Sequence, residues 1–132
     1  MKEIIRENKF SEVSYSKEHD LLEVVWKSKI VPSEEYRATW EATRKLVFKN
    51  FLSDGRQQGL VSPDDRKWFQ STIVKEAADK GLTTAAVVIA DNPFKKYYMN
   101  MIFKVVKVSG VKMKIFTDYN KAKKWLLENK NS

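Results

Sequence analysis

The chain has 132 residues, the usual length of a single domain. It contains no cysteine, which excludes disulfides, thiolate metal sites and cysteine catalysis. Its 25 Lys and Arg outnumber its 17 Asp and Glu, and the formal net charge of +8 favours anionic partners. The first residues are too polar for a signal peptide, and the longest apolar run, residues 85–90, is far shorter than the ~20 residues of a membrane helix. We therefore expect a soluble, cytoplasmic protein without a transmembrane segment.

The first third of the chain has the pattern of a β-hairpin. Residues 12–16 alternate in polarity, residues 17–20 form a charged turn, and residues 21–27 return with β-branched and aromatic side chains. The turn holds the single histidine, His19, whose surroundings favour an ordinary solvated side chain.

A first helix is predicted over residues 34–46. Ser33 is the expected N-cap, and Glu34 and Glu35 complement the helix dipole. The predicted buried stripe consists of Tyr36, Trp40, Thr43 and Val47. Residues 48–53 are predicted to form a strand, and a continuation of the helix is the alternative.

A second helix is predicted to begin at Ser62, since a serine cap is followed by proline and by an acidic residue three positions on. Gly81 is its expected end. Its predicted buried face consists of Trp68, Phe69, Thr72, Ile73 and Ala77. Residues 83–90 are small or β-branched, which is typical of a strand buried on both faces in the middle of a parallel sheet.

The last part of the chain predicts a helix, a strand and a final helix. Asn92 and Pro93 open the third helix, residues 112–116 form the strand, and Asp118 caps the last helix. The predicted inward residues are Phe94, Tyr98, Met101, Ile102 and Val105 on the third helix and Ala122, Trp125 and Leu126 on the last.

The order ββαβαβαβα predicts a single α/β domain over residues 1–132. We expect a mixed sheet that starts with an antiparallel hairpin and continues with parallel β-α units, with helices packed against it.

Four short motifs, in this order, carry a resemblance that covers nearly the whole chain. They are an aromatic pair in the first helix (Tyr36, Trp40), a strand ending in Asp-x-Arg (residues 52–56), a Ser-Pro-Asp-Asp helix start followed by Trp68, and a C-terminal Ala-x-x-Trp-Leu helix (residues 122–126). The chain resembles the STAS/CRAL–TRIO-like superfamily, in particular small bacterial single-domain members akin to the anti-anti-sigma factor. The resemblance implies a STAS-like fold and a regulatory or ligand-binding role.

The sequence departs from the anti-anti-sigma branch at one functional motif. That branch carries a phosphorylatable serine in an Asp-Ser-Ser-Gly loop, whereas residues 53–59 here read Ser-Asp-Gly-Arg-Gln-Gln-Gly. A phosphorylation switch is therefore not expected, and Ser53 and Ser62 are poor substitutes.

No catalytic constellation is recognisable. One histidine and no cysteine leave no usual zinc site, and neither common glycine-rich nucleotide-binding motif occurs. Asp54, Asp91 and Asp118 follow predicted strands and could gather around Mg²⁺, although helix capping is the simpler explanation of acids at strand ends. We expect a non-enzymatic protein with no cofactor and no metal.

Two features suggest where a ligand or partner would bind. Asp54 and Arg56 are predicted to pair and hold their loop, or to present Arg56 to an anion. Core packing explains the four tryptophans, but the third helix has too many large side chains for one buried stripe, so that some must be exposed or line a cavity. The predicted binding residues are Asp54, Arg56, Trp68, Phe94, Tyr97, Tyr98 and Met101.

Two classes of partner fit these features. The first is a small lipid-like or amphipathic ligand, or a protein docked on the same helices; members of the resembled family often pair, so a homodimer is also compatible. The alternative is association with nucleic acid or an anionic membrane through the basic surface. Nucleic acid is the less favoured of these, because the aromatic residues beside the lysines fall mostly on faces assigned to the core.

Overall fold

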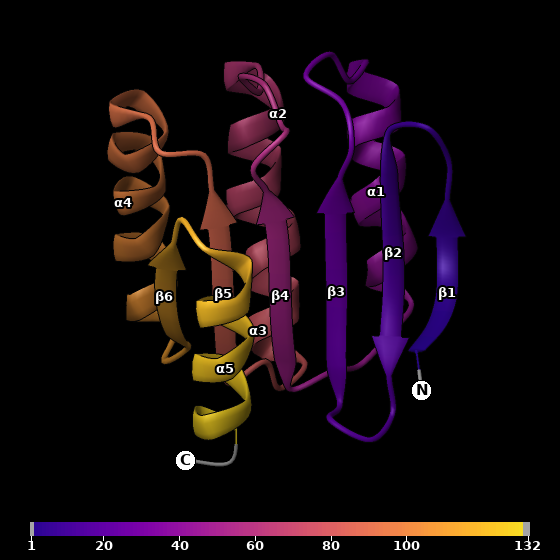
Figure 1. The fold of residues 1–132 in the computed structure, drawn as a ribbon, viewed down its shortest axis with the longest axis vertical. Coiled ribbons are helices and arrows are strands. Elements are labelled where there is room, and N and C mark those ends of the chain that lie inside the picture. The colour runs from indigo at the N-terminus through magenta and orange to yellow at the C-terminus, as the bar shows by residue number, and fades with distance from the viewer. Residues whose placement is uncertain (1, 131–132) are drawn as a thin grey trace.

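A computed structural model describes residues 2–130 and shows an α/β fold built on one six-stranded mixed sheet (Figure 1). The strands lie in the sheet in the order in which they occur in the chain. They are β1 (Lys2–Glu7), β2 (Ser11–Ser16), β3 (Leu21–Trp26), β4 (Asn50–Gly55), β5 (Thr84–Ile89) and β6 (Lys112–Phe116). The first three strands pair antiparallel and β3 to β6 pair parallel. The hairpin of β2 and β3 and the parallel strands after it are as the sequence predicted.

The strand that sequence reasoning missed is β1. It pairs antiparallel with β2 and extends the predicted hairpin to a three-stranded meander, with a register shift between Ile4 and Arg6. Its sequence, KEIIRE, is rich in charge because it forms an edge of the sheet, where polar side chains discourage pairing with other chains.

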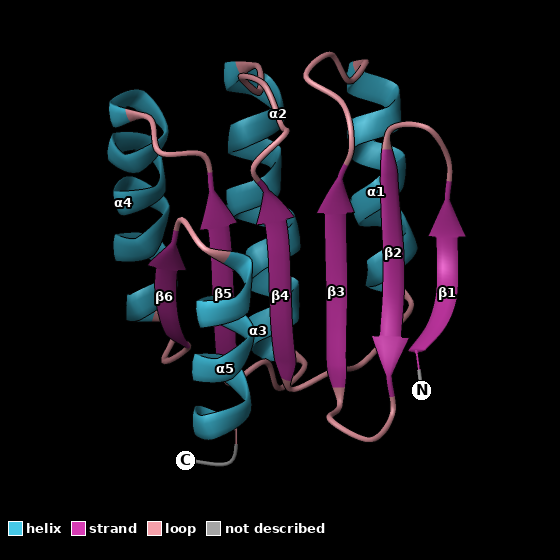
Figure 2. Cartoon of the chain, in the orientation of Figure 1, coloured by secondary structure: helices cyan, strands magenta, loops and turns pink. Residues whose placement is uncertain are grey.

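Helices cover the two faces of the sheet unequally (Figure 2). One face carries four α-helices and a π-helical turn that lies between two of them. Within residues 2–130, the other face carries a single helix, α5, packed on β4, β5 and β6. The helices are α1 (Ser33–Arg44), α2 (Pro63–Trp68), α3 (Lys75–Asp79), α4 (Pro93–Val108) and α5 (Tyr119–Asn129), and the π-helical turn is η1 (Phe69–Val74). None of these helices is both long enough and apolar enough to cross a bilayer.

The predicted second helix is present as three consecutive segments, α2, η1 and α3, of which the middle one is the π-helical turn. Its start is as predicted, because Ser62 Oγ accepts a hydrogen bond from Asp65 N. The predicted cap of α1 is wrong. Pro32 occupies that position without a side-chain cap, and the Ser33 hydroxyl donates to Asp65 instead.

The core has two parts, one on each face of the sheet. Beneath the helical layer, aromatic and aliphatic side chains form two adjoining clusters around Trp26 and Ile102. Beneath α5, a smaller cluster around Leu52 and Leu126 is built from Leu, Ala and Val. β5 contributes Ala85 to one face and Ala86 to the other, in keeping with its predicted burial on both sides.

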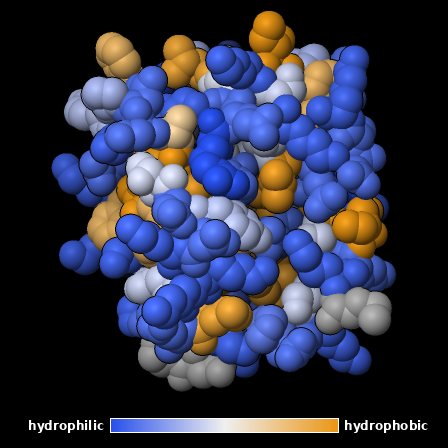
Figure 3. Space-filling view, viewed as in Figure 1, coloured by the Kyte–Doolittle hydropathy of each residue, from blue (hydrophilic) through white to orange (hydrophobic). Residues whose placement is uncertain are grey.

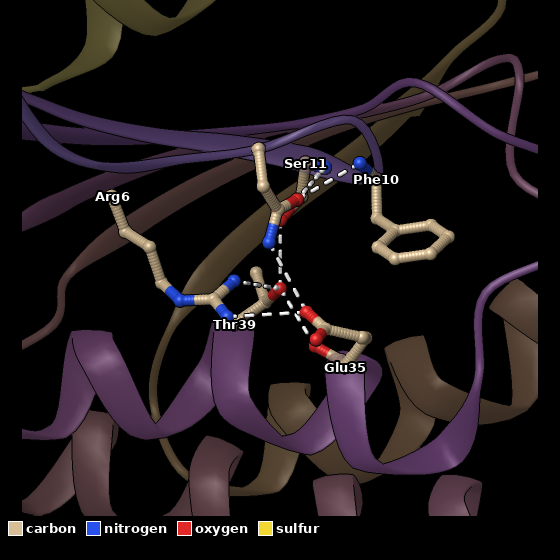
Figure 4. A network of polar contacts seen from close by, with 6 residues as sticks. Arg6, Phe10, Ser11, Glu35 and Thr39 are labelled. Carbon is tan, nitrogen blue, oxygen red and sulfur yellow. Dashed lines mark hydrogen bonds and ion pairs between the residues drawn. The ribbon is translucent and has the colours of Figure 1, made fainter.

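A polar network fastens α1 to the edge strand β1 and to its neighbour β2 (Figure 4). Glu35 accepts hydrogen bonds from Arg6 and Asn8, each at 3.1 Å, and the buried Ser11 and Thr39 hydroxyls lie 2.7 Å apart. These contacts bridge residues about thirty positions apart in sequence and fix the position of α1 against β1 and β2.

Two predicted helix faces need correction. Val47 lies after the end of α1 and is exposed. On α4, Phe94, Met101 and Val105 were predicted to point inward but are exposed, whereas Ile102 was correctly predicted to be buried. The residues of α4 that are fully buried are Ile102 and Val106, so the helix is rotated relative to the predicted stripe.

Candidate functional site

An apolar cavity of ≈ 120 Å³ lies between the sheet and the helices α1, η1, α3 and α4. Its walls come from separate parts of the chain. They include Trp40 from α1, Ile73 from η1, Ala77 from α3, Ala85 from β5 and Tyr98 from α4. The cavity therefore exists only once the parallel strands and their helices have come together.

Small side chains leave this space open where larger ones would fill it. β5 presents Ala85 to the helical face and α3 presents Ala77. Protein interiors normally pack with few voids larger than a water molecule, so an unfilled space among aromatic rings is a specific feature of this core.

One wall of the cavity is a stack of aromatic rings. Trp26 and Tyr36 are stacked at a centroid distance of 5.4 Å, and Trp40 lies 4.6 Å from Phe69. Aromatic pairs at such distances add to the stability that burial provides. We infer that this wall is rigid.

Tyrosine hydroxyls give the cavity a polar side. Burial raises the pKa of Tyr36, and the neighbouring Tyr98 raises it further. Burial also raises the pKa of Tyr98 to about 12, although the Arg66 guanidinium opposes the shift. Both hydroxyls are therefore neutral near neutral pH, and each can donate and accept hydrogen bonds.

The indole of Trp40 is the most unusual polar group among the lining residues. The side chain is buried, and its N–H makes no hydrogen bond of normal geometry within residues 2–130. It lies close enough to the Tyr36 oxygen to favour the ionised form of that tyrosine. A buried donor without a good acceptor costs free energy, so an acceptor on a bound molecule would be stabilising here.

The predicted binding residues on α4 separate into two groups. Tyr98 lines the cavity, as do Met99 and Ile102. Phe94, Tyr97 and Met101 are exposed and lie away from it. The excess of large side chains noted in the sequence is thus divided between a cavity and an outer surface.

Trp68 is half-buried and does not line the cavity. Its ring lies 6.5 Å from that of Tyr36, and the Arg37 guanidinium lies 4.9 Å from its centroid. It forms part of the packing between α1 and α2.

Asp54 and Arg56 form the predicted pair, on the face of the sheet opposite the cavity. The Arg56 Nε and Nη2 atoms donate to the two carboxylate oxygens at 2.9 and 2.8 Å, and the guanidinium lies over the Tyr119 ring. The hydrogen bond to Asp54 raises the pKa of Arg56. The pair therefore ties the end of β4 to α5, as the structural alternative predicted.

The acidic residues at strand ends do not gather around a common point. Asp91 pairs with Lys96, and Asp118 caps α5 by accepting from Lys121 N. Among the described residues, no group of three or more potential ligands could hold a metal ion.

A buried carboxylate that sequence reasoning missed lies in the middle of β3. Glu23 accepts hydrogen bonds from Tyr119 at 2.6 Å and Lys123 at 3.3 Å, and Lys2 lies 3.6 Å away. Burial, followed by the hydrogen bond to Glu23, raises the pKa of Tyr119. The sequence of β3 could have indicated this buried carboxylate, because Glu23 is a charged residue between two apolar positions of the strand.

A second, polar pocket of ≈ 180 Å³ lies beyond the carboxyl ends of β3 and β4. Its buried acid is Asp65, which accepts from the Ser33 hydroxyl at 2.9 Å and from Arg37 Nε at 2.8 Å. Burial raises the pKa of Asp65, but hydrogen bonds from Arg37, Ser33 and Ser62 outweigh this and lower it overall. Asp65 therefore joins α1 to α2.

Comparison of the chain with protein-family models, curated proteins and solved structures gave no match in any of the three. The STAS-like resemblance consequently stays a prediction from the sequence motifs.

Proposed function

We propose that this protein is a non-enzymatic binding module that holds a small amphipathic ligand in the cavity between the sheet and α1, η1, α3 and α4. The observation that carries the proposal is the combination of apolar walls with polar groups at one place. Trp40 supplies a buried N–H without a good partner, and Tyr36 and Tyr98 supply neutral hydroxyls. Apolar pockets with a few convergent polar groups are the usual form of small-molecule sites.

The size of the cavity limits the apolar part of the ligand. Its volume is ≈ 120 Å³. An engineered cavity of about 150 Å³ in another protein binds benzene. The apolar part is therefore about as large as one aromatic ring or a short alkyl chain, and a larger ligand would require α4 to move outward.

The charged groups beside the cavity support binding rather than chemistry. Glu76 is the one carboxylate among the described lining residues, and Arg44 holds it with hydrogen bonds of 2.9 and 2.6 Å. Those hydrogen bonds lower the pKa of Glu76. A carboxylate held in this way is a poor general base.

Binding of p-cresol and octanoate, followed by ligand-observed NMR, tests the proposal. Ala85→Leu fills the cavity from β5 and should abolish binding. Ala42→Leu makes the same change on α1, at a half-buried position outside the lining residues and the core clusters, and should leave binding intact. Trp40→Phe keeps a ring but removes the N–H, and should weaken p-cresol binding about five- to tenfold, the value of one hydrogen bond.

The comparison of the two alanine-to-leucine variants tests whether the probes bind in the cavity. Equal binding by wild type and Ala85→Leu would place the ligand elsewhere and reject the proposal. Failure of the wild type to bind either probe, together with the absence of any retained small molecule in native mass spectra of the freshly purified protein, would also reject it.

A further inference from the structure

The outward surface of α4 carries an unbroken apolar stripe. Five large side chains recur at spacings of three, four, four and three residues, which places them on one side of a helix. Their exposed fractions range from 47% for Val105 to 90% for Val108. The members of this stripe, called the α4 stripe below, are Phe94, Tyr97, Met101, Val105 and Val108.

The α4 stripe is unlike the other exposed apolar residues of the described chain. Ile4, Ile30, Val47 and Leu60 are exposed on an edge strand or in loops and do not share one helix face. Single exposed apolar residues are normal on protein surfaces, whereas a contiguous group of this kind marks an interaction site. Figure 3, which views the molecule from the side of α5, shows a largely hydrophilic surface on which the orange side chains are scattered.

All the charged side chains of α4 are positive. Its 16 residues include four lysines and no acidic residue. Lys96, Lys104 and Lys107 are exposed, and Lys96 pairs with Asp91 just before the helix. A helix with an apolar stripe beside lysines has the composition of segments that lie in the interface of a bilayer.

We propose that α4 docks this protein on the surface of an anionic phospholipid bilayer. The α4 stripe enters the boundary between headgroups and acyl chains, and the exposed lysines contact anionic headgroups. Charge complementarity favours this occupant over a second copy of the chain, because two α4 helices would bring their lysines together. The aliphatic members Met101, Val105 and Val108 favour lipid over nucleic acid, because they cannot stack on bases.

Sedimentation with vesicles of phosphatidylcholine, alone or with phosphatidylserine added, tests this proposal. The wild type should sediment with the phosphatidylserine vesicles and stay in solution with phosphatidylcholine alone, and added salt should release it. Met101→Asp and Val108→Asp should each reduce the bound fraction about tenfold, because a charge enters the apolar boundary. Val47→Asp is the matched control for Val108→Asp, since it introduces the same charge at an exposed valine outside α4 and should bind as the wild type does.

Three results would overturn the proposal. The first is an equal loss of vesicle binding in Val47→Asp and Val108→Asp, because the loss would then come from the change in net charge and not from the α4 stripe. The second is a dimer in light scattering that Met101→Asp dissociates, which would make a second copy the occupant. The third is binding of single-stranded RNA that Val108→Asp abolishes while vesicle binding is absent. Circular dichroism of each variant confirms that the fold is retained.

Discussion

The helices α1 and α4 cover the same face of the sheet but are attached to it very differently. α1 buries four of its 12 residues, and α4 buries two of its 16. α1 is also held by polar contacts at both ends. In its first turn Glu35 accepts from Arg6 and Asn8, and at its last residue Arg44 donates to Glu76. α4 instead presents an apolar surface to solvent.

This difference separates a firmly anchored helix from a weakly anchored one, although both contribute side chains to the cavity. Stability of a helix in a protein comes mainly from burial of its apolar face, so the helix with fewer buried groups is the one that can bind a partner or shift. α4 is also the helix that contributes Tyr98, Met99 and Ile102 to the cavity. The proposed ligand site and the proposed membrane surface thus share one weakly anchored element.

Replacing an aromatic residue beneath α1 should give the largest effect. Trp26 is 1% exposed and contacts both Tyr36 and Trp40. Trp26→Ala should lower the free energy of unfolding by about 3–5 kcal/mol, measured by urea denaturation, because it leaves a large cavity. Phe94→Ala removes a ring from α4 and should change stability by no more than about 0.5 kcal/mol. Similar losses in the two variants would contradict the contrast between the helices.

Replacing Asp65, the acid that joins α1 to α2, with a neutral side chain should lower the free energy of unfolding by an intermediate amount. Asp65→Asn should cost about 1–3 kcal/mol near neutral pH, since it weakens the charged hydrogen bonds from Arg37 and Ser33. Because the folded pKa lies below the ordinary value of 3.8, this stabilisation is present above that pH. It should be lost as the pH falls below 3.8 toward the folded pKa.

The matched control is Asp64→Asn, one residue earlier at an exposed position of the same helix. Urea titrations of both variants and the wild type at neutral and acidic pH provide the measurement. A deficit in Asp65→Asn that persists unchanged at acidic pH would show that the carboxylate charge is not its source.

Smaller effects are expected for the polar network that joins α1 to β1 and β2, and the smallest for an exposed ion pair beside α4. Glu35→Gln should cost about 0.5–1 kcal/mol, because it removes the charge that Arg6 contacts but keeps an acceptor. Asp91→Asn breaks the exposed pair with Lys96 beside α4 and should produce no measurable change in thermal unfolding. A larger loss from Asp91→Asn than from Glu35→Gln would mean that α4 is the better anchored helix.

Much of the fold could be predicted because its signals are local. The hairpin, the cap at Ser62, and the small, β-branched run of β5 each depend on neighbouring residues, and all were confirmed. β1 was missed because a charged edge strand has no hydrophobic alternation that distinguishes it from a loop. Of the candidate site, the sequence indicated the surplus of large residues on α4 and the Asp54–Arg56 pair, but assigned Tyr36 and Trp40 only to the core.

The sequence by itself determined the types and order of the elements from β2 onward, because periodicity and caps are properties of short segments. It could not determine which side of α4 faces the sheet, because that helix has two apolar sides. Only the tertiary structure decided between them, by packing Ile102 and Val106 against the core with Ala85 and Met113 and leaving the α4 stripe outside. The cavity is likewise a tertiary property, since the space beside Trp40 is defined by strands and helices that meet only in the folded chain.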